Sequence, residues 1–231
     1  MTANSETDVS SPLGTPTRRT IVKGAAWTIP VLALATQTPA AAASAVVCPS
    51  VPGGAGWVTG NPQTGSLTAA AGLNGWGGTG YNNGAGQSNV FVSLRDNAGT
   101  TDPATVSTSV SLPFQAGGIY TFTIQVLSQH GDLTQRPVPT RASTVQTLDI
   151  SLGGTQLEFF STYADVTGGT QTVIRNSTSS YPWQTYTYTY YATTSGLQTL
   201  SYLFTLPPHI GVSQDDIFAT LPVFTSCVVG A

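Results

Sequence analysis

The chain is poor in charge, in sulfur and in long apolar runs. Charged side chains make up 7% of its 231 residues, and it contains two cysteines, one methionine and one lysine. After residue 43, four arginines remain against eight acids, which gives that part of the chain a formal charge of −4. A basic patch that would attract nucleic acid or an anionic lipid surface is therefore absent. Serine, threonine, asparagine, glutamine and glycine must keep such a surface in solution.

Residues 24–35 form an apolar run that is too short for a membrane span. A spanning helix needs roughly 20 apolar residues, and Pro30 interrupts this run. The run follows the basic pair Arg18-Arg19 and precedes the alanines at positions 41–43. This order of basic region, short apolar region and small-residue cleavage site is typical of a cleaved export signal. We therefore predict a signal peptide over residues 1–43. Removing these 43 of 231 residues leaves a mature chain of 188 residues, residues 44–231, without a membrane span.

The pair Arg18-Arg19, followed by Ile21, Val22 and Lys23, resembles the twin-arginine export motif. The leader is also similar to leaders on surface proteins of high-GC Gram-positive bacteria. This resemblance implies that the domain is exported already folded, to the cell surface or beyond. Lipid attachment at Cys48 is not expected, because Val47 stands where lipoprotein processing requires a small residue.

Cys48 and Cys227 lie close to the two ends of the mature chain. Outside the cell they would oxidise, so we predict a disulfide between them. The alternatives are free thiols, or a metal site completed by His130 and His209. Those two histidines lack the spacing of a metal-ligand motif.

Apolar and polar residues alternate with a period of two from residue 90 onward, and no segment after the leader has a helical period. The predicted strands cover residues 90–95, 104–112, 119–127, 144–152, 156–162, 173–174, 184–193, 197–206 and 217–228. Residues 72–88 contain so many glycines that we expect a long loop there. The pattern predicts one all-β domain, an antiparallel two-sheet sandwich with jelly-roll topology.

Four short motifs occur in a characteristic order between residues 47 and 227. They are Gly117-Gly-Ile-Tyr-Thr-Phe, Leu148-Asp-Ile-Ser-Leu-Gly-Gly, Pro182-Trp183 before a strand, and Asp215-Asp216-Ile217-Phe218. Together they resemble the motifs of carbohydrate-binding-module-like, or galactose-binding-like, jelly-roll domains. The resemblance implies sugar binding, adhesion or an accessory role.

The same resemblance implies a structural calcium ion at Asp215 and Asp216. Calcium requires six to eight oxygen ligands, and the expected partner segment, residues 51–61, contains no acid. The alternative is a turn in which the two aspartates accept hydrogen bonds from local backbone amides.

Trp57, Trp76, Tyr81 and Trp183 are the candidate ligand-binding residues, because flat aromatic rings stack on the apolar faces of sugars. All four lie near predicted loops or strand ends. We expect Trp76 and Tyr81, which are set among glycines, to be exposed. The alternative is that their rings fold back on the sheet.

Tyr186, Tyr188 and Tyr190 share one face of a predicted strand, and threonines occupy the other face. Large aromatic residues are usually buried, with their polar tips near solvent. We therefore expect these three rings to pack into the sandwich with their hydroxyls at its rim.

Catalysis is not predicted, because the acids are few and unpaired. A glycosidase needs two carboxylates roughly 5–10 Å apart, and Glu158 is the only glutamate after residue 43. It lies between Leu157 and Phe159, and we expect it to face solvent. Asp149 precedes the same predicted hairpin, so the two acids either pair across it or remain separate surface groups. Neither a nucleophile elbow nor a phosphate-binding loop is present.

The preferred hypothesis is a secreted or cell-surface, non-catalytic binding domain that recognises carbohydrate or another envelope polymer. The alternative is a structural or adhesive surface protein that binds a protein partner through strand edges or loops. Low charge and threonine-rich strand faces favour the alternative. A structural calcium ion is the one cofactor that the resemblance implies.

Overall fold

The computed structural model describes residues 45–68, 74–77, 89–93, 95–130, 145–162, 172–174, 183–208 and 215–230. The chain divides into two units, Met1–Ser44 and Ala45–Ala231, and every described residue belongs to the second. The predicted signal peptide therefore lies outside the described residues. In these ranges the chain forms strands and one three-residue 3₁₀ turn, η1 (Gly54–Gly56). The described ranges contain no helix with the length and apolar character to cross a membrane.

The strands form two sheets, named here the β4 sheet and the β5 sheet. The β4 sheet has the order β1 (Val58–Thr64), β4 (Ala104–Phe114), β10 (Gly196–Leu206), β6 (Thr147–Leu152), β7 (Thr155–Ser161), β8 (Thr172–Val173). The β5 sheet has the order β12 (Val223–Val229), β5 (Gly118–His130), β11 (Asp215–Thr220), β3 (Val90–Ser93), β2 (Asn74–Gly77), and β9 (Gln184–Tyr191) also pairs with β5. All the pairings between these strands are antiparallel except the parallel pair β7–β8.

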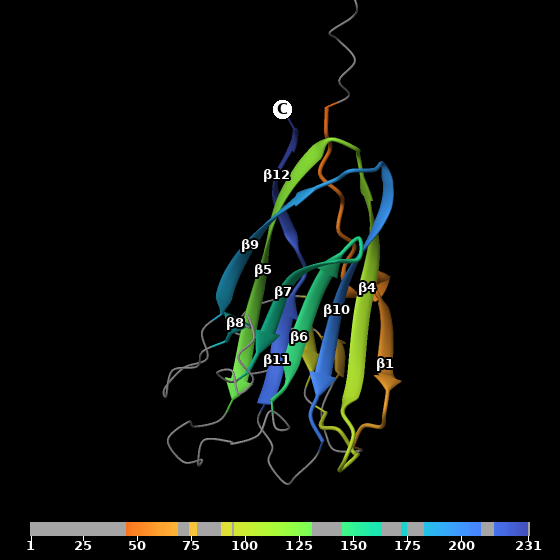
Figure 1. The fold of residues 1–231 in the computed structure, drawn as a ribbon, viewed down its shortest axis with the longest axis vertical. Coiled ribbons are helices and arrows are strands. Elements are labelled where there is room, and N and C mark those ends of the chain that lie inside the picture. The colour runs from red at the N-terminus through yellow and green to blue at the C-terminus, as the bar shows by residue number, and fades with distance from the viewer. Residues whose placement is uncertain are drawn as a thin grey trace, which may run out of the picture. The chain divides into compact units, whose positions relative to one another are not determined.

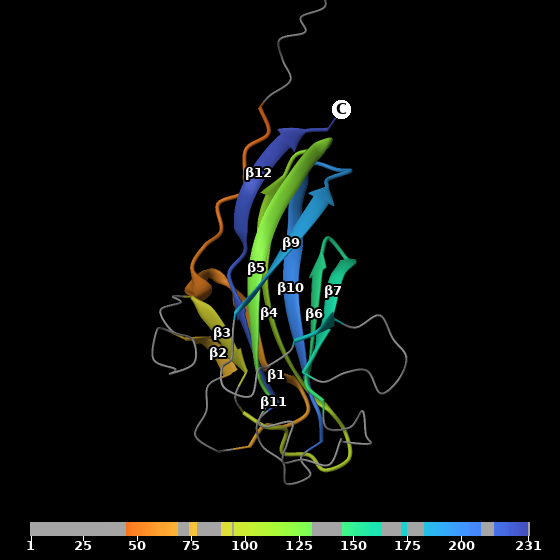
Figure 2. The ribbon, with the colours of Figure 1, turned by 90° about the vertical axis from the view of Figure 1, so that its left-hand side faces the viewer.

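Most connections carry the chain from one sheet to the other (Figures 1 and 2). From β3 it passes to β4, back to β5, across to β6, β7 and β8, then to β9, to β10 and finally to β11. This alternation agrees with the expected jelly-roll topology. The prediction of an all-β, two-sheet sandwich is confirmed.

The two-residue period decides which side chains enter the core. Along β4, Val106, Val110 and Leu112 are buried, whereas Ser107 and Ser109 between them are only partly covered. Ring pairs then connect the two inner faces: Phe91 of β3 stacks on Phe204 of β10, with ring centroids 4.9 Å apart. Phe114 of β4 meets Tyr120 of β5 edge-on at 4.7 Å.

The prediction of a loop over residues 72–88 is wrong for Asn74–Gly77, which form β2 and pair with β3. The β2 strand packs so tightly that a Cβ atom on Gly54 would lie 2.4 Å from the Cβ of Trp76. Glycine at position 54 therefore permits the ring to fold onto the sheet. The β1 strand was also not predicted, because its glycine and proline are unusual inside a strand.

The single strand predicted over residues 217–228 is two strands, β11 and β12, separated at Leu221 and Pro222. Pro222 has no backbone N–H to donate, so the ladder stops there. Both strands pair with β5: Phe218 of β11 lies opposite Leu127, and Val223 of β12 lies opposite Thr123.

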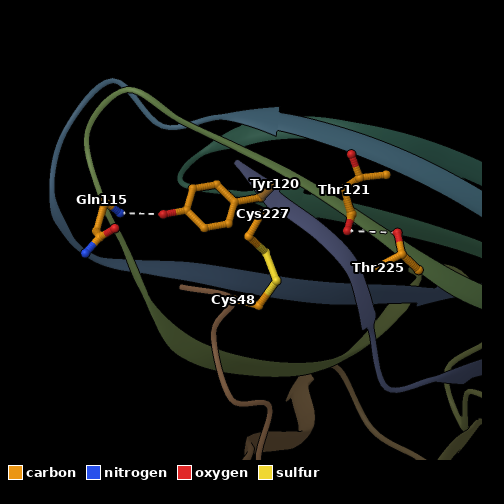
Figure 3. Close-up of a disulfide and its surroundings, with 6 residues drawn as sticks. All are labelled: Cys48, Gln115, Tyr120, Thr121, Thr225 and Cys227. Carbon is orange, nitrogen blue, oxygen red and sulfur yellow. Dashed lines mark hydrogen bonds between the residues drawn. A yellow bond between two sulfur atoms is a disulfide. The ribbon is translucent and has the colours of Figure 1, made fainter. Parts of the chain in front are cut away.

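A disulfide joins Cys48 to Cys227 across 179 residues, as predicted (Figure 3). Cys227 lies in β12 opposite Tyr120 of β5. The Tyr120 hydroxyl accepts a hydrogen bond of 2.7 Å from the backbone N–H of Gln115. The bridge therefore fixes the segment that precedes β1 to a strand in the β5 sheet.

Replacing both cysteines by alanine should lower the free energy of unfolding by about 5 kcal/mol, because a loop of this length loses much entropy when it is closed. Urea unfolding of the double variant and of the oxidised protein measures the difference. A reductant should destabilise the oxidised protein by a similar amount and leave the double variant unchanged. Equal stability of the two proteins would contradict this role for the bridge.

Candidate functional site

Trp57 and Trp76 lie together in the core. Trp57 is 6% exposed, and its indole Nε1 donates to the carbonyl oxygen of Pro52 at 3.3 Å. Trp76 lies 4.8 Å from it between ring centroids, and its Nε1 donates to the Thr108 hydroxyl at 2.9 Å. The expected exposure of Trp76 is wrong, because its ring packs against the core. Tyr81 lies outside the described residues.

Trp183 belongs to a different cluster. It packs against Val90, Val92, Leu127 and Phe218. Val90 and Val92 flank the core residue Phe91 in β3, so they point to the opposite, outer face of the β5 sheet. The structure therefore separates Trp183 from Trp57 and Trp76. A ligand role for any of these residues stays a prediction.

Asp215 and Asp216 are the first two residues of β11, opposite His130 and Gln129 of β5. They therefore take part in a ladder rather than a turn. Among the described residues, no three side chains of histidine, cysteine, aspartate or glutamate come together as a metal site would need. Calcium at this position remains a prediction from the resemblance.

Glu158 faces the interior of the sandwich, and the expectation that it faces solvent is wrong. The ladder between β6 and β7 shifts its register between Ile150 and Ser151, so that Glu158 lies opposite Ile150. Residues directly opposite one another share a face of the sheet, and Ile150 is fully buried. The Thr172 hydroxyl of β8 donates to Glu158 Oε1 at 2.5 Å.

Asp149 lies on the other face of the same hairpin. Asp149 lies opposite Phe159, the residue that follows Glu158 in β7. Successive residues of a strand point to opposite faces, so Asp149 and Glu158 lie on different faces of the hairpin. Its Oδ2 accepts a hydrogen bond of 2.7 Å from the side-chain amide of Gln156. The two carboxylates therefore do not form the pair that a glycosidase would need.

The tyrosine row of β9 packs inward, as predicted. Tyr188 is 8% exposed, Tyr186 and Tyr190 are half-buried, and the threonines between them are exposed. The Tyr186 ring meets Phe160 of β7 edge-on at 4.7 Å, and its hydroxyl donates to Gln184 Oε1 at 2.8 Å. No described residue offers a hydrogen-bond partner to the Tyr188 hydroxyl.

Burial and the nearby Glu158 carboxylate together raise the pKa of Tyr188 far above its ordinary value. The same two causes, in the same order, raise the pKa of Tyr186. The carboxylate therefore acts electrostatically on both hydroxyls.

We call Glu158, Thr172, Gln184, Tyr186 and Tyr188 the edge cluster, because β8 ends the β4 sheet and β9 pairs only with β5.

The edge cluster offers a carboxylate, an amide and hydroxyls beside aromatic rings. Such a set can accept and donate hydrogen bonds to a polar ligand. Sequence reasoning missed the cluster because simple alternation cannot locate the register shift that turns Glu158 inward. The apolar run Phe159-Phe160 is the one signal of that shift in the sequence.

The chain matches no protein-family model, and no curated protein matches it. Solved structures with a similar fold include an apo-form cyclase from Fischerella sp., which is 15% identical, with a TM-score of 0.42, over 84% of this chain and 93% of that chain. Another is a family 35 carbohydrate binding module from an environmental isolate, which is 13% identical, with a TM-score of 0.29, over 71% of this chain and 94% of that chain. At these values neither likeness supports a statement about function.

Stability should fall as the pH rises above about 10, the ordinary pKa of tyrosine. Burial, which is the larger cause, raises the pKa of both Tyr188 and Tyr202, so the folded state keeps protons that the unfolded state releases. Their contribution is complete below that pH and is lost above it. In Tyr188→Phe the decline should be shallower by up to about 1.4 kcal/mol per pH unit. Urea unfolding at a series of pH values measures the slope, and Tyr191→Phe, whose side chain is 57% exposed, is the control. A Tyr188→Phe slope equal to that of the unaltered protein would contradict this account.

Proposed function

We propose that this chain is an exported, non-catalytic binding domain that recognises carbohydrate at the edge cluster. The observation that carries the proposal is the inward carboxylate of Glu158, which lies near the Tyr188 hydroxyl, a buried group to which no described residue hydrogen-bonds. Both groups lie where the two sheets end, at β7, β8 and β9.

The chemistry of the edge cluster suits a sugar. Sugar hydroxyls both donate and accept hydrogen bonds, and the cluster supplies acceptors at Glu158 and Gln184 and a hydroxyl at Tyr188. Sugar rings also present apolar faces, against which the half-buried ring of Tyr186 can pack. A few convergent polar groups among aromatic side chains are typical of sites for small molecules.

A second candidate function is adhesion to a protein partner. Tyr191 and Val228 both lie opposite Ile119, so the three side chains form a row on the outer face of the β5 sheet. Tyr191 is 57% exposed and Val228 is 50% exposed. Exposed apolar side chains that lie together mark interaction surfaces. The row of Tyr191, Ile119 and Val228 therefore favours adhesion near Val228, at the end of β12.

Binding at the edge cluster should depend on the carboxylate. In Glu158→Gln the shape and the bond from Thr172 are kept, but the charge is lost, so affinity for a bound glycan should fall at least about tenfold. Tyr188→Phe removes one hydroxyl and should weaken binding by about three- to tenfold. A screen of glycans and cell-wall polysaccharides, followed by calorimetric titration, measures both effects.

Asp149→Asn is the matched control, because it removes the same charge from the other face of the same hairpin. It should change affinity by less than about twofold. Full binding by a folded Glu158→Gln protein would exclude this site. No binding of any glycan by the unaltered, folded protein would exclude the carbohydrate proposal and favour the adhesive one.

Export through the twin-arginine route is also part of the proposal, supported by the leader and by a disulfide that forms in oxidising compartments. Replacing Arg18 and Arg19 by lysine should stop export, because the motif depends on the arginine pair. Immunoblotting of cell and medium fractions measures the exported share. Lys23→Arg keeps the pair and should export normally. Undiminished export of the double variant would contradict this route.

A further inference from the structure

The Glu158 carboxylate has no cationic partner among the described residues. Arg95 is the only lysine or arginine in those ranges, and its guanidinium donates to the backbone oxygen of Thr68, 2.8 Å from Nε. The hydrogen bond from Thr172 reaches Oε1 of Glu158, and no described residue donates to Oε2. Among the described residues, Thr172 is therefore the one hydrogen-bond donor to this half-buried carboxylate, through Oε1.

The aromatic rings of the edge cluster pack against rings of the core. Phe160 and Tyr186 are in edge-on contact, and Tyr188 packs against Phe122 at 5.6 Å between ring centroids. The negative potential of the carboxylate extends over the hydroxyls of Tyr186 and Tyr188. Among the residues that the structure describes, this half-buried charge meets no counterion, and a cationic ligand would stabilise it. Ring faces attract the same cation, because their quadrupole is negative at the face.

We propose that the edge cluster binds a sugar that carries a free ammonium group, as in a de-acetylated amino-sugar polymer. The ammonium would occupy the position beside Glu158 Oε2, and the sugar hydroxyls would meet Gln184 and Tyr188. This inference rests on the proposed function and adds the charge of the ligand to it.

Three oligosaccharides of the same linkage, which differ in whether they carry an ammonium group, test the role of the ligand's charge directly. Calorimetric titration of the purified protein with an oligomer of glucosamine, with its N-acetylated counterpart and with a neutral glucose oligomer compares their affinities. The glucosamine oligomer should bind at least about tenfold more tightly than the other two. Its affinity should also fall when salt is raised, because salt screens the attraction between charges.

Variants then locate the charge. Glu158→Gln should reduce the preference for the glucosamine oligomer to less than about twofold, whereas Asp149→Asn should keep it. Circular dichroism checks that each variant is folded. Thr172→Val, which removes the hydroxyl that holds Oε1, should weaken the preference as well. The comparison of the three oligomers on the unaltered protein needs no variant, so it decides the question even if one variant fails to fold.

The outcomes separate the two proposals. Equal affinity for the three oligomers, lost in Glu158→Gln, would overturn the cationic ligand and support carbohydrate binding at this site. Equal weakening by Glu158→Gln and Asp149→Asn would indicate attraction to overall charge and would overturn the inference. Binding of none of the oligomers, and of no other glycan, would overturn both proposals.

Discussion

The packing of two sheets through alternating side chains is the constraint on which this structure depends. Successive residues of a strand point to opposite faces. Therefore β10 can bury Phe204 only if Thr205 points outward, and β9 can bury Tyr188 only if Thr187 does. Apolar side chains fill the space between the sheets. The inward carboxylate of Glu158 is accommodated near β8, where the Thr172 hydroxyl donates to it.

Low charge shapes the chemistry of the edge cluster. In a protein with many lysines and arginines, an inward glutamate would soon find a counterion. After residue 43 eight acids face four arginines, and Arg95, the one arginine among the described residues, is bonded to backbone elsewhere. Among the described residues no cation opposes the field of the Glu158 carboxylate, and weak screening inside the protein extends the reach of that field. Burial is the larger cause of the raised pKa values of Tyr186 and Tyr188, and the Glu158 carboxylate is the second cause.

The alternation in the sequence predicts the fold well where strands are regular and long. The inward tyrosines of β9 and the Cys48–Cys227 bridge follow from pattern and position alone. The strand β2 could not be predicted, because Trp76 is held there by contacts with distant Trp57 and Phe91, not by local propensity. The site was missed for a related reason. One extra residue in β7 reverses the face of Glu158, and nothing local to the chain specifies where such a shift occurs.

The disulfide has a mechanical consequence. A tension that enters the domain just before Cys48 and leaves just after Cys227 would pass through the sulfur–sulfur bond, across Cα atoms only 5.3 Å apart. The two cysteines are 179 positions apart, so 179 − 1 = 178 residues lie between them. Those residues would lie outside the path of the force. The sandwich between them would therefore remain unstretched while its two ends were pulled apart. In a domain built in this way the disulfide carries the applied force, and the folded sandwich does not extend under it.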